Sequence, residues 1–497
     1  MWRRASALRY VGIYVALTRP VARFTFDRLL TLLAFLAIAL AAFLMPAQND
    51  TWWHLKAGER IWTTRHVLLS DTFSFTASGA FWPNHEWLSQ VLFYAVYALG
   101  GLPLLTVLCA SAVVGAWAIA WRLAPASPRV KFLLVAWVLS AATTAWTVRP
   151  QAISLLLVAV TVWLLVRRRY VWLPPLFVVW ANLHGAVLTG LVLVAAACAA
   201  ALWEAIATHD EPRLSSRSLR PLRPLRSLTL TAALCALATL ATPLGYHLWL
   251  EIPAFFVRIR QVHVDEFSAP QLLAPLWIPF WTAAIAVVVC AAARGRRLLQ
   301  DAEARRRGDA TLCACALALL AMALTAARNV GPFLLVAVPA LAALMPTPTR
   351  SFLMPRVEHL MVNSAAALAS MAIVTGTVGL SYARRADRLQ WDPLPAASVQ
   401  ALEGCSGNLY NRFDEGGYLI WFAPQRPVFI DSRYLPYTDD FIKEHVRIEQ
   451  SGNADDAFRR YGIRCAYVPV DSLVGNRLRD AGWRTLYRDR RWTVLAD

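Results

Sequence analysis

The chain has 497 residues, of which 58% are hydrophobic and only 16% are charged, and its mean hydropathy is +0.45. A soluble domain is about 45–50% apolar with about a quarter of its residues charged, so this composition excludes a soluble protein and predicts a multi-pass membrane protein. The net charge of +18 does not predict nucleic-acid binding, because the arginines cluster in short loops between apolar runs, as in the cytoplasmic loops of membrane proteins.

The N-terminal part of the chain fixes the expected orientation. Residues 1–28 are basic and are expected to stay in the cytoplasm. The apolar run from Leu29 to Met45 lacks a small-residue cleavage pattern, so we interpret it as a retained helix. Residues 46–100 then form the first outer loop. Its last part, Glu86 to Gly100, is short and begins with polar residues, which favours an amphipathic helix at the outer membrane surface. The alternative, a true span, would invert the topology of everything that follows.

The first outer loop is rich in ionisable and aromatic residues. Asp50, His54, Lys56, His85 and Glu86 are interleaved with tryptophans. A plain connector between two membrane helices does not need this chemistry, so we interpret the loop as catalytic, with Asp50 and Glu86 as candidate acid–base residues. If the segment is helical, His54 shares a face with Asp50. The tryptophans could stack on sugar rings, but a belt of aromatic residues at the membrane interface explains them at least as well.

The remaining apolar runs, within residues 29–382, complete the expected membrane domain. If the N-terminus is cytoplasmic, every arginine-rich segment falls on the cytoplasmic side, which predicts about eleven spans and an outer C-terminus. No internal repeat of the kind that marks many transporters is visible. After the first, the expected spans are 102–121, 132–147, 152–166, 171–183, 186–206, 228–243, 272–293, 310–326, 330–345 and 359–380.

Four polar clusters lie at the ends of these runs, and the topology places all of them on the outer side, with the Asp50 loop. Polar groups at membrane depth are costly unless they face a cavity or a partner. For each cluster alone, an interfacial anchor or a local turn is about as probable as a functional site, but their shared side favours one site. The clusters are residues 147–151 with Arg149 and Gln151, 182–185 with Asn182 and His184, 242–247, and 327–330 with Arg328 and Asn329.

Arg149 and Arg328 are suited to a phosphate, because a guanidinium group matches phosphate oxygens and stays charged. No carboxylate lies within a few residues of either arginine, so a local ion pair does not explain them. We therefore expect both to line one cavity, with Asp50 at its rim, and an anionic ligand to balance their charge.

Residues 383–497 are mixed polar and apolar, and their alternating strand and helix patterns predict a small extracytoplasmic α/β domain. Residues 408–411, 427–431, 465–470 and two later segments are the expected strands, and residues 411–418 are expected to form a turn into a buried segment. Asp431 to Tyr434 follows an expected strand, where a surface ion pair is more probable than a binding site. Cys405 and Cys465 could form a disulfide, although sequence alone gives no distance between them; the other six cysteines lie in apolar runs as small core residues.

These features resemble the glycosyltransferase C superfamily, and most closely its bacterial members related to protein mannosyltransferases and lipid A aminoarabinose transferases. The resemblance rests on the basic N-terminus, one span, an outer loop that opens with Asp50 and two tryptophans, the segment Trp82 to Leu88, about eleven spans and an outer C-terminal domain. The acidic pair common in the family loop is reduced here to Asp50 followed by Thr51. The segments RPQ, ANLHG, ARNVGP, FDEGGYLIW and VFIDSRY also resemble a large set of functionally uncharacterised bacterial membrane proteins.

The resemblance implies a metal- and cofactor-independent enzyme of the bacterial inner membrane that moves a sugar from a polyprenyl-phosphate carrier to an extracytoplasmic acceptor, with inversion. Asp50 carries over as the base and Glu86 is the second candidate. The expected substrate-binding residues are His54, Lys56, His85, Arg149, Gln151, Asn182, His184, Arg328 and Asn329. Two other functions stay open: a transporter or flippase for a lipid-linked substrate, and a non-catalytic envelope assembly protein that binds glycans.

Overall fold

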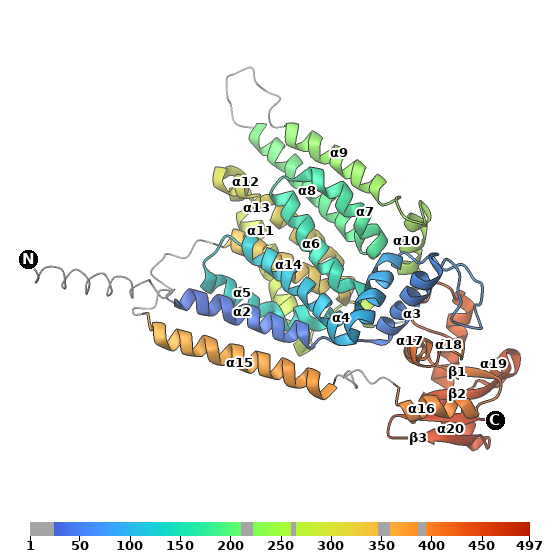
Figure 1. Cartoon of the computed structure of the whole chain (residues 1–497). Helices are drawn as coiled ribbons and strands as arrows, with labels where there is room; N and C mark the ends of the chain where they lie inside the picture. The colour runs from blue at the N-terminus through green and yellow to red at the C-terminus, as the bar shows by residue number, and fades with distance from the viewer. Residues whose placement is uncertain (1–23, 210–221, 260–264, 346–357, 386–393) are drawn as a thin grey trace, which may run out of the picture.

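A computed structural model describes residues 24–209, 222–259, 265–345, 358–385 and 394–497. Most of the basic N-terminal segment, and the arginines between residues 210 and 221, lie outside these ranges. The described chain is mainly helical and forms a bundle, with a small α/β unit at one end (Figure 1). The bundle helices are α2 (Phe26–Phe43), α4 (Trp87–Leu123), α5 (Pro128–Ala142), α6 (Pro150–Val166), α7 (Leu173–Leu183), α8 (Val187–His209), α9 (Leu222–Ala238), α11 (Ile278–Gln300), α13 (Asp309–Ala323), α14 (Val330–Leu344) and α15 (Leu360–Arg385).

Six of the described helices are long and apolar enough to cross a membrane, and four further apolar helices are shorter. The protein is therefore a multi-pass membrane protein, although the expected number of spans is not confirmed. The apolar core joins most of the bundle, and α14 is buried along nearly its whole length. In contrast, α15 lies at the edge of the bundle beside α2 (Figure 1).

Two glycines divide the long helix α4. Gly100 and Gly101 have non-helical backbone angles, and Gly101 has a φ of 63°, which favours glycine. The segment before them packs against α3 (Asn49–Thr64) of the first outer loop. That contact is close, because a Cβ on Gly58 would lie 2.0 Å from the carbonyl oxygen of Gln90. The structure thus separates residues 87–99 from the following helix at the position where the sequence predicted a boundary.

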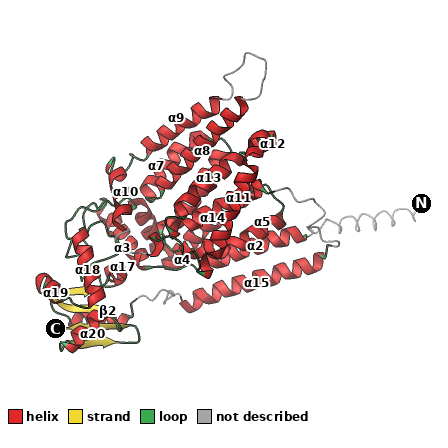
Figure 2. Ribbon diagram, turned by 180° about the vertical axis from the view of Figure 1, so that it is seen from behind, coloured by secondary structure: helices red, strands yellow, loops and turns green. Residues whose placement is uncertain are grey.

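The C-terminal unit is built on a mixed sheet in the order β1-β2-β4-β3. β1 pairs with β2 in parallel, and the other pairings are antiparallel. Figure 2 shows this sheet and its helices at one end of the bundle. The strands are β1 (Asn408–Asn411), β2 (Ile463–Pro469), β3 (Arg484–Arg488) and β4 (Trp492–Ala496), and the helices are α16 (Ala396–Ala401), α17 (Phe413–Phe422), α18 (Asp439–Ser451), α19 (Asp455–Tyr461) and α20 (Leu473–Asp480).

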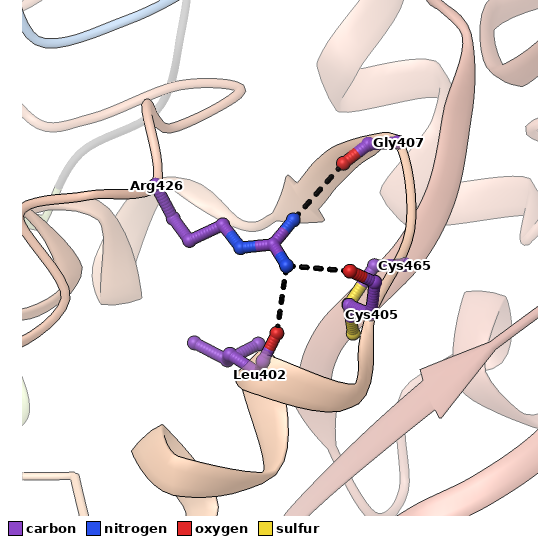
Figure 3. The surroundings of a disulfide bond; sticks show 5 residues. All are labelled: Leu402, Cys405, Gly407, Arg426 and Cys465. Atoms are coloured by element: carbon purple, nitrogen blue, oxygen red, sulfur yellow. Dashed lines mark hydrogen bonds between the residues drawn. A yellow bond between two sulfur atoms is a disulfide. The ribbon is translucent and has the colours of Figure 1, made fainter.

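A disulfide joins Cys405, just before β1, to Cys465 in β2. Beside it, the guanidinium group of Arg426 donates hydrogen bonds to the backbone carbonyls of Leu402, Cys405 and Gly407 (Figure 3). Buried carbonyl groups need such donors, so Arg426 closes the irregular turn that leads into β1.

Two local expectations for the C-terminal unit are wrong. Residues 427–431 are not a strand of the sheet; Val428 makes an isolated parallel bridge to Ser74 of the first outer loop instead. Residues 413–422 are the helix α17 and not a turn. α17 packs directly against α3, where a Cβ on Gly417 would lie 2.3 Å from the backbone oxygen of Asn49. The C-terminal unit and the first outer loop therefore form one packed assembly.

Candidate functional site

A cavity of about 1680 Å³ lies between the end of the bundle and the C-terminal unit. Six helices each contribute their N-cap or their first residues to the wall of this cavity. Helix N-termini carry partial positive charge and free N–H groups, so this end of the bundle favours anionic groups. The six helices are α3, α4, α6, α8, α14 and α17.

Asp50 lies in the first turn of α3 and faces this cavity. At the start of the helix the Thr51 hydroxyl accepts the backbone N–H of Gln48 at 3.0 Å, and it also donates to the carbonyl of Val148 at 2.7 Å. This bond ties α3 to the segment that carries Arg149. The Arg149 guanidinium lies 2.7 Å from Asp50 Oδ2.

Among the described residues, three donors reach the Asp50 carboxylate. Oδ1 accepts the indole N–H of Trp53 at 3.2 Å and the hydroxyl of Ser432, and Oδ2 faces Arg149. A carboxylate has about four lone-pair sites, so about one site, on Oδ2, is left for a ligand.

Arg149 and Arg328 both line the cavity and share one carboxylate. Glu266, in the short helix η3 (Asp265–Phe267), accepts two hydrogen bonds from Arg149, at 3.1 and 3.4 Å, and lies 3.8 Å from Arg328 Nη1. Arg328 also stacks on the ring of Phe267, with its guanidinium carbon 4.5 Å from the ring centre. Burial by itself raises the pKa of Glu266, but the two arginines outweigh it and lower that pKa.

These pairs correct one expectation. The charges of Arg149 and Arg328 are balanced by protein carboxylates that are remote in sequence: Glu266 is 117 residues from Arg149. An anionic ligand is therefore not needed to explain the two arginines in the described chain.

Glu86 and three histidines form the second polar group of the cavity. Glu86 Oε1 lies 3.2 Å from Nε2 of His184, and Oε2 lies 3.6 Å from Nε2 of His54. Burial raises the pKa of Glu86 to about 8, and burial lowers the pKa of His54, His85 and His184. At neutral pH the group is therefore mostly uncharged, and Glu86 holds its proton.

The tautomer of His184 follows from its partners. The Ser154 hydroxyl accepts the indole N–H of Trp180 at 2.9 Å and lies 2.9 Å from His184 Nδ1. The backbone N–H of Ala186 also points to Nδ1, at 3.4 Å. Since Nδ1 receives these donors, the proton of the neutral ring is on Nε2 and faces Glu86.

A buried ion cluster joins the first outer loop to the C-terminal unit beside Asp50. The Arg433 side chain is completely buried, with Nη2 2.6 Å from Asp71 Oδ1 and 2.7 Å from Asp431 Oδ2. Its guanidinium lies against the rings of Phe73 and Trp82, at 4.9 and 4.7 Å from their centres. The expectation of a surface ion pair at Asp431 to Tyr434 is wrong, because both partners of Arg433 are buried.

The structure brings most of the predicted site residues into one cavity wall and leaves two outside it. Lys56 pairs with Glu59 at 2.5 Å and lies over the ring of Trp421. The Asn182 side chain accepts from Trp87 and donates to two backbone carbonyls, which is a structural role. The predicted residues in the wall are Asp50, His54, His85, Glu86, Arg149, Gln151, His184, Arg328 and Asn329.

Glu266 and Ser432 were missed as site residues. Glu266 lies in the polar stretch before an expected span, on the outer side, where a carboxylate facing the arginine clusters could have been sought. Ser432 lies in the segment Asp431 to Tyr434, which the sequence analysis did consider. Its contact with α3 could not be predicted, because no pattern in the neighbouring residues indicates it. Among the described residues, no group of three or more His, Cys, Asp or Glu side chains is placed to hold a metal ion.

A comparison with protein-family models and with curated proteins found no match. Among solved structures, the chain is similar to ArnT from Cupriavidus metallidurans. The crystal structure of ArnT bound to undecaprenyl phosphate has a TM-score of 0.51 and 14% identity, covering 93% of this chain and 97% of that one. The apo crystal structure has a TM-score of 0.51 and 13% identity, covering 99% and 98%. The predicted resemblance is confirmed at the level of the fold alone: the chain is a multi-pass membrane protein whose fold is similar to that of ArnT.

Proposed function

We propose that the protein is a membrane glycosyltransferase that moves a sugar from a polyprenyl-phosphate carrier to an extracytoplasmic acceptor. The observation that carries the proposal is the Asp50–Arg149–Glu266–Arg328 chain of contacts in a cavity where six helices begin. The similar fold of ArnT, which was solved bound to undecaprenyl phosphate, supports the class of donor.

In this proposal, the two arginines bind the carrier phosphate. Guanidinium groups can stabilise the negative charge that grows on a phosphate as it leaves a sugar. Arg149 and Arg328 both lie within 4 Å of the Glu266 carboxylate, so a phosphate that replaced this carboxylate would be close to both. Glu266 then holds the two arginines in place before the donor binds.

Asp50 is the proposed base. Transfer with inversion needs a group that takes the proton of the acceptor hydroxyl as that oxygen attacks the sugar. Asp50 Oδ2 keeps a lone-pair site and lies beside the arginine that would hold the leaving phosphate. Glu86, whose pKa is raised to about 8, keeps its proton at neutral pH and is better suited to donating a hydrogen bond. His85 and His184 line the same cavity as Glu86.

The test is sugar transfer in membranes that contain the overproduced protein. A panel of radiolabelled polyprenyl-phosphate sugars is supplied, and label in new lipid, glycan or protein products is measured against membranes that contain Asp50→Asn. The proposal expects transfer from at least one donor by the wild type alone. Equal labelling with both proteins, or none with either, would contradict it.

We further propose that the cavity and the C-terminal unit face the extracytoplasmic side of a bacterial inner membrane. The arginine-rich loops at the opposite helix ends support this orientation. Reporter fusions after Arg169 and within residues 294–307 should read cytoplasmic, whereas fusions within residues 65–80 and at the C-terminus should read outside. A cytoplasmic C-terminus would overturn the orientation.

A further inference from the structure

Ser432 of the C-terminal unit makes three hydrogen bonds with the first turn of α3. Its Oγ accepts the side-chain N–H groups of Asn49 at 3.0 Å and Trp53 at 3.1 Å, and its hydroxyl donates to Asp50 Oδ1. A serine hydroxyl has one proton and two lone pairs. Because both lone pairs are used, the proton can only point to Asp50, and the direction of this bond is fixed.

The backbone that carries Ser432 is held on both sides. Its neighbours Asp431 and Arg433 form a buried ion pair, and Arg433 also binds Asp71 of the first outer loop. The Tyr437 hydroxyl donates to Asp431 at 2.7 Å. These buried partners leave Ser432 little freedom to move away from α3, since separating them would expose unpaired charge to a low dielectric.

The hydroxyl of Ser432 therefore controls how the Asp50 carboxylate is turned. Ser432 and Trp53 occupy Oδ1, which directs Oδ2 to Arg149 and the cavity. Without the serine hydroxyl, the Trp53 N–H is the one donor to Oδ1 that remains among the described residues, and in the native site Ser432 and Asp50 share it. The carboxylate can then rotate about its terminal bond, whose torsional preference is broad.

We infer that Ser432 is a positioning residue for Asp50, so that the C-terminal α/β unit completes the catalytic centre of the membrane domain. This inference rests on the proposed function, because it assigns Ser432 a part in the proton transfer from the acceptor. It also gives a reason for the close packing of α17 against α3, which brings residues 431–433 to the cavity.

The experiment compares Ser432→Ala and Ser432→Thr with the wild type in the transfer assay, using purified protein and the donor that the wild type accepts. Loss of a hydrogen bond to a charged group should lower kcat about 10–100-fold, whereas KM for the donor should stay within about 2-fold. Ser432→Thr keeps the hydroxyl and should recover most of kcat. In an Asp50→Asn background, Ser432→Ala should cause no further loss, because the two residues act as one unit.

Ser398→Ala is the matched control. Ser398 is a buried serine of the same unit, and its hydroxyl lies 2.8 Å from the Tyr467 hydroxyl, outside the cavity wall. It should lower thermal stability and leave kcat unchanged. If the wild type is active, Asp50→Asn is strongly slowed and Ser432→Ala turns over normally, the inference fails and the proposed function stands. Equal losses in Ser432→Ala and Ser432→Thr, or a further loss in the Asp50→Asn background, would also overturn the inference. Absence of transfer by the wild type with every donor would overturn both.

Discussion

Removing the Glu266 carboxylate should tighten the binding of the carrier, although Glu266 is part of the cavity wall. Glu266 pairs with Arg149 and Arg328, the two cations that we propose hold the carrier phosphate. A phosphate that binds there must first displace this carboxylate. Glu266→Gln keeps the size of the side chain and removes the competing charge.

The geometry sets the expected magnitude. Glu266 makes two hydrogen bonds with Arg149 and a longer contact of 3.8 Å with Arg328. A hydrogen bond to a charged group contributes about 1.5–3 kcal/mol, but the Glu266 side chain is 32% exposed, so solvent screening reduces this value. We expect a net gain of about 1–2 kcal/mol in carrier binding, which is roughly 5–30-fold in Kd.

The assay is the equilibrium binding of undecaprenyl phosphate to the purified protein in lipid nanodiscs, at fixed ionic strength. Glu251→Gln is the control, because Glu251 lines the same cavity but is not a partner of either arginine in the described ion pairs. The control should change Kd much less than Glu266→Gln. If Glu266→Gln binds the carrier no better than the wild type, the phosphate does not take the place of that carboxylate and the proposed phosphate site is wrong.

Three further results are expected. Arg149→Lys and Arg328→Lys should each weaken undecaprenyl-phosphate binding about 10-fold, because an ammonium group cannot form the planar fork; unchanged Kd values in the same assay would reduce the arginines to anchors. Arg433→Leu should destabilise the fold by about 3–5 kcal/mol, because it leaves Asp71 and Asp431 buried without a cation, and a normal unfolding temperature in detergent would contradict the buried cluster. Glu86→Gln should be more stable than the wild type at pH 8.5 and about as stable at pH 5. Folding raises the pKa of Glu86 from 4.5 to about 8, so the wild type loses free energy of unfolding as the pH rises from about 4.5 to about 8, whereas the glutamine variant does not. If the unfolding temperatures of the wild type and of Glu86→Gln change with pH in the same way, this prediction is refuted.

The polar clusters of the cavity could be predicted because topology and helix ends are local properties of the sequence. Three of the four clusters stand just before an expected span, so each of these marks the start of the next helix, and the arginine-rich loops mark the opposite ends. The structure places Arg149 at the start of α6, His184 between the end of α7 and the start of α8, and Arg328 just before α14, all in one wall. The segment Glu86 to Gly100 was predicted to be separate from the following span because it is short and begins with polar residues, and the structure interrupts the helix at Gly100 and Gly101.

The contacts between the clusters could not be predicted, because they join residues that are far apart in the chain. Glu266 reaches Arg149 across 117 residues, and Ser432 reaches Asp50 across 382. No periodicity or spacing encodes such a pair. For the same reason, Arg433 was expected in a surface ion pair: its burial depends on Asp71 and Trp82 of another segment.

The sequence predicts a turn over residues 411–418, whereas the structure forms α17 there, although two adjacent glycines usually weaken a helix. Here the glycines serve close packing. A Cβ on Gly416 would lie 2.3 Å from the carbonyl oxygen of Ile430, and one on Gly417 would lie 2.3 Å from Asn49. Tertiary contacts with α3 and with residues 430–431 therefore outweigh the local preference.

The central claim, that Asp50 is the base of a sugar transfer from a polyprenyl-phosphate carrier, is tested most directly by single-turnover transfer with purified Asp50→Asn. The amide keeps the shape of the side chain and removes the proton acceptor. The account predicts a rate lower by about 10²–10⁴-fold, with undecaprenyl phosphate still bound, whereas Glu86→Gln keeps measurable turnover. A fully active Asp50→Asn, together with an inactive Glu86→Gln, would contradict it and move the base to Glu86.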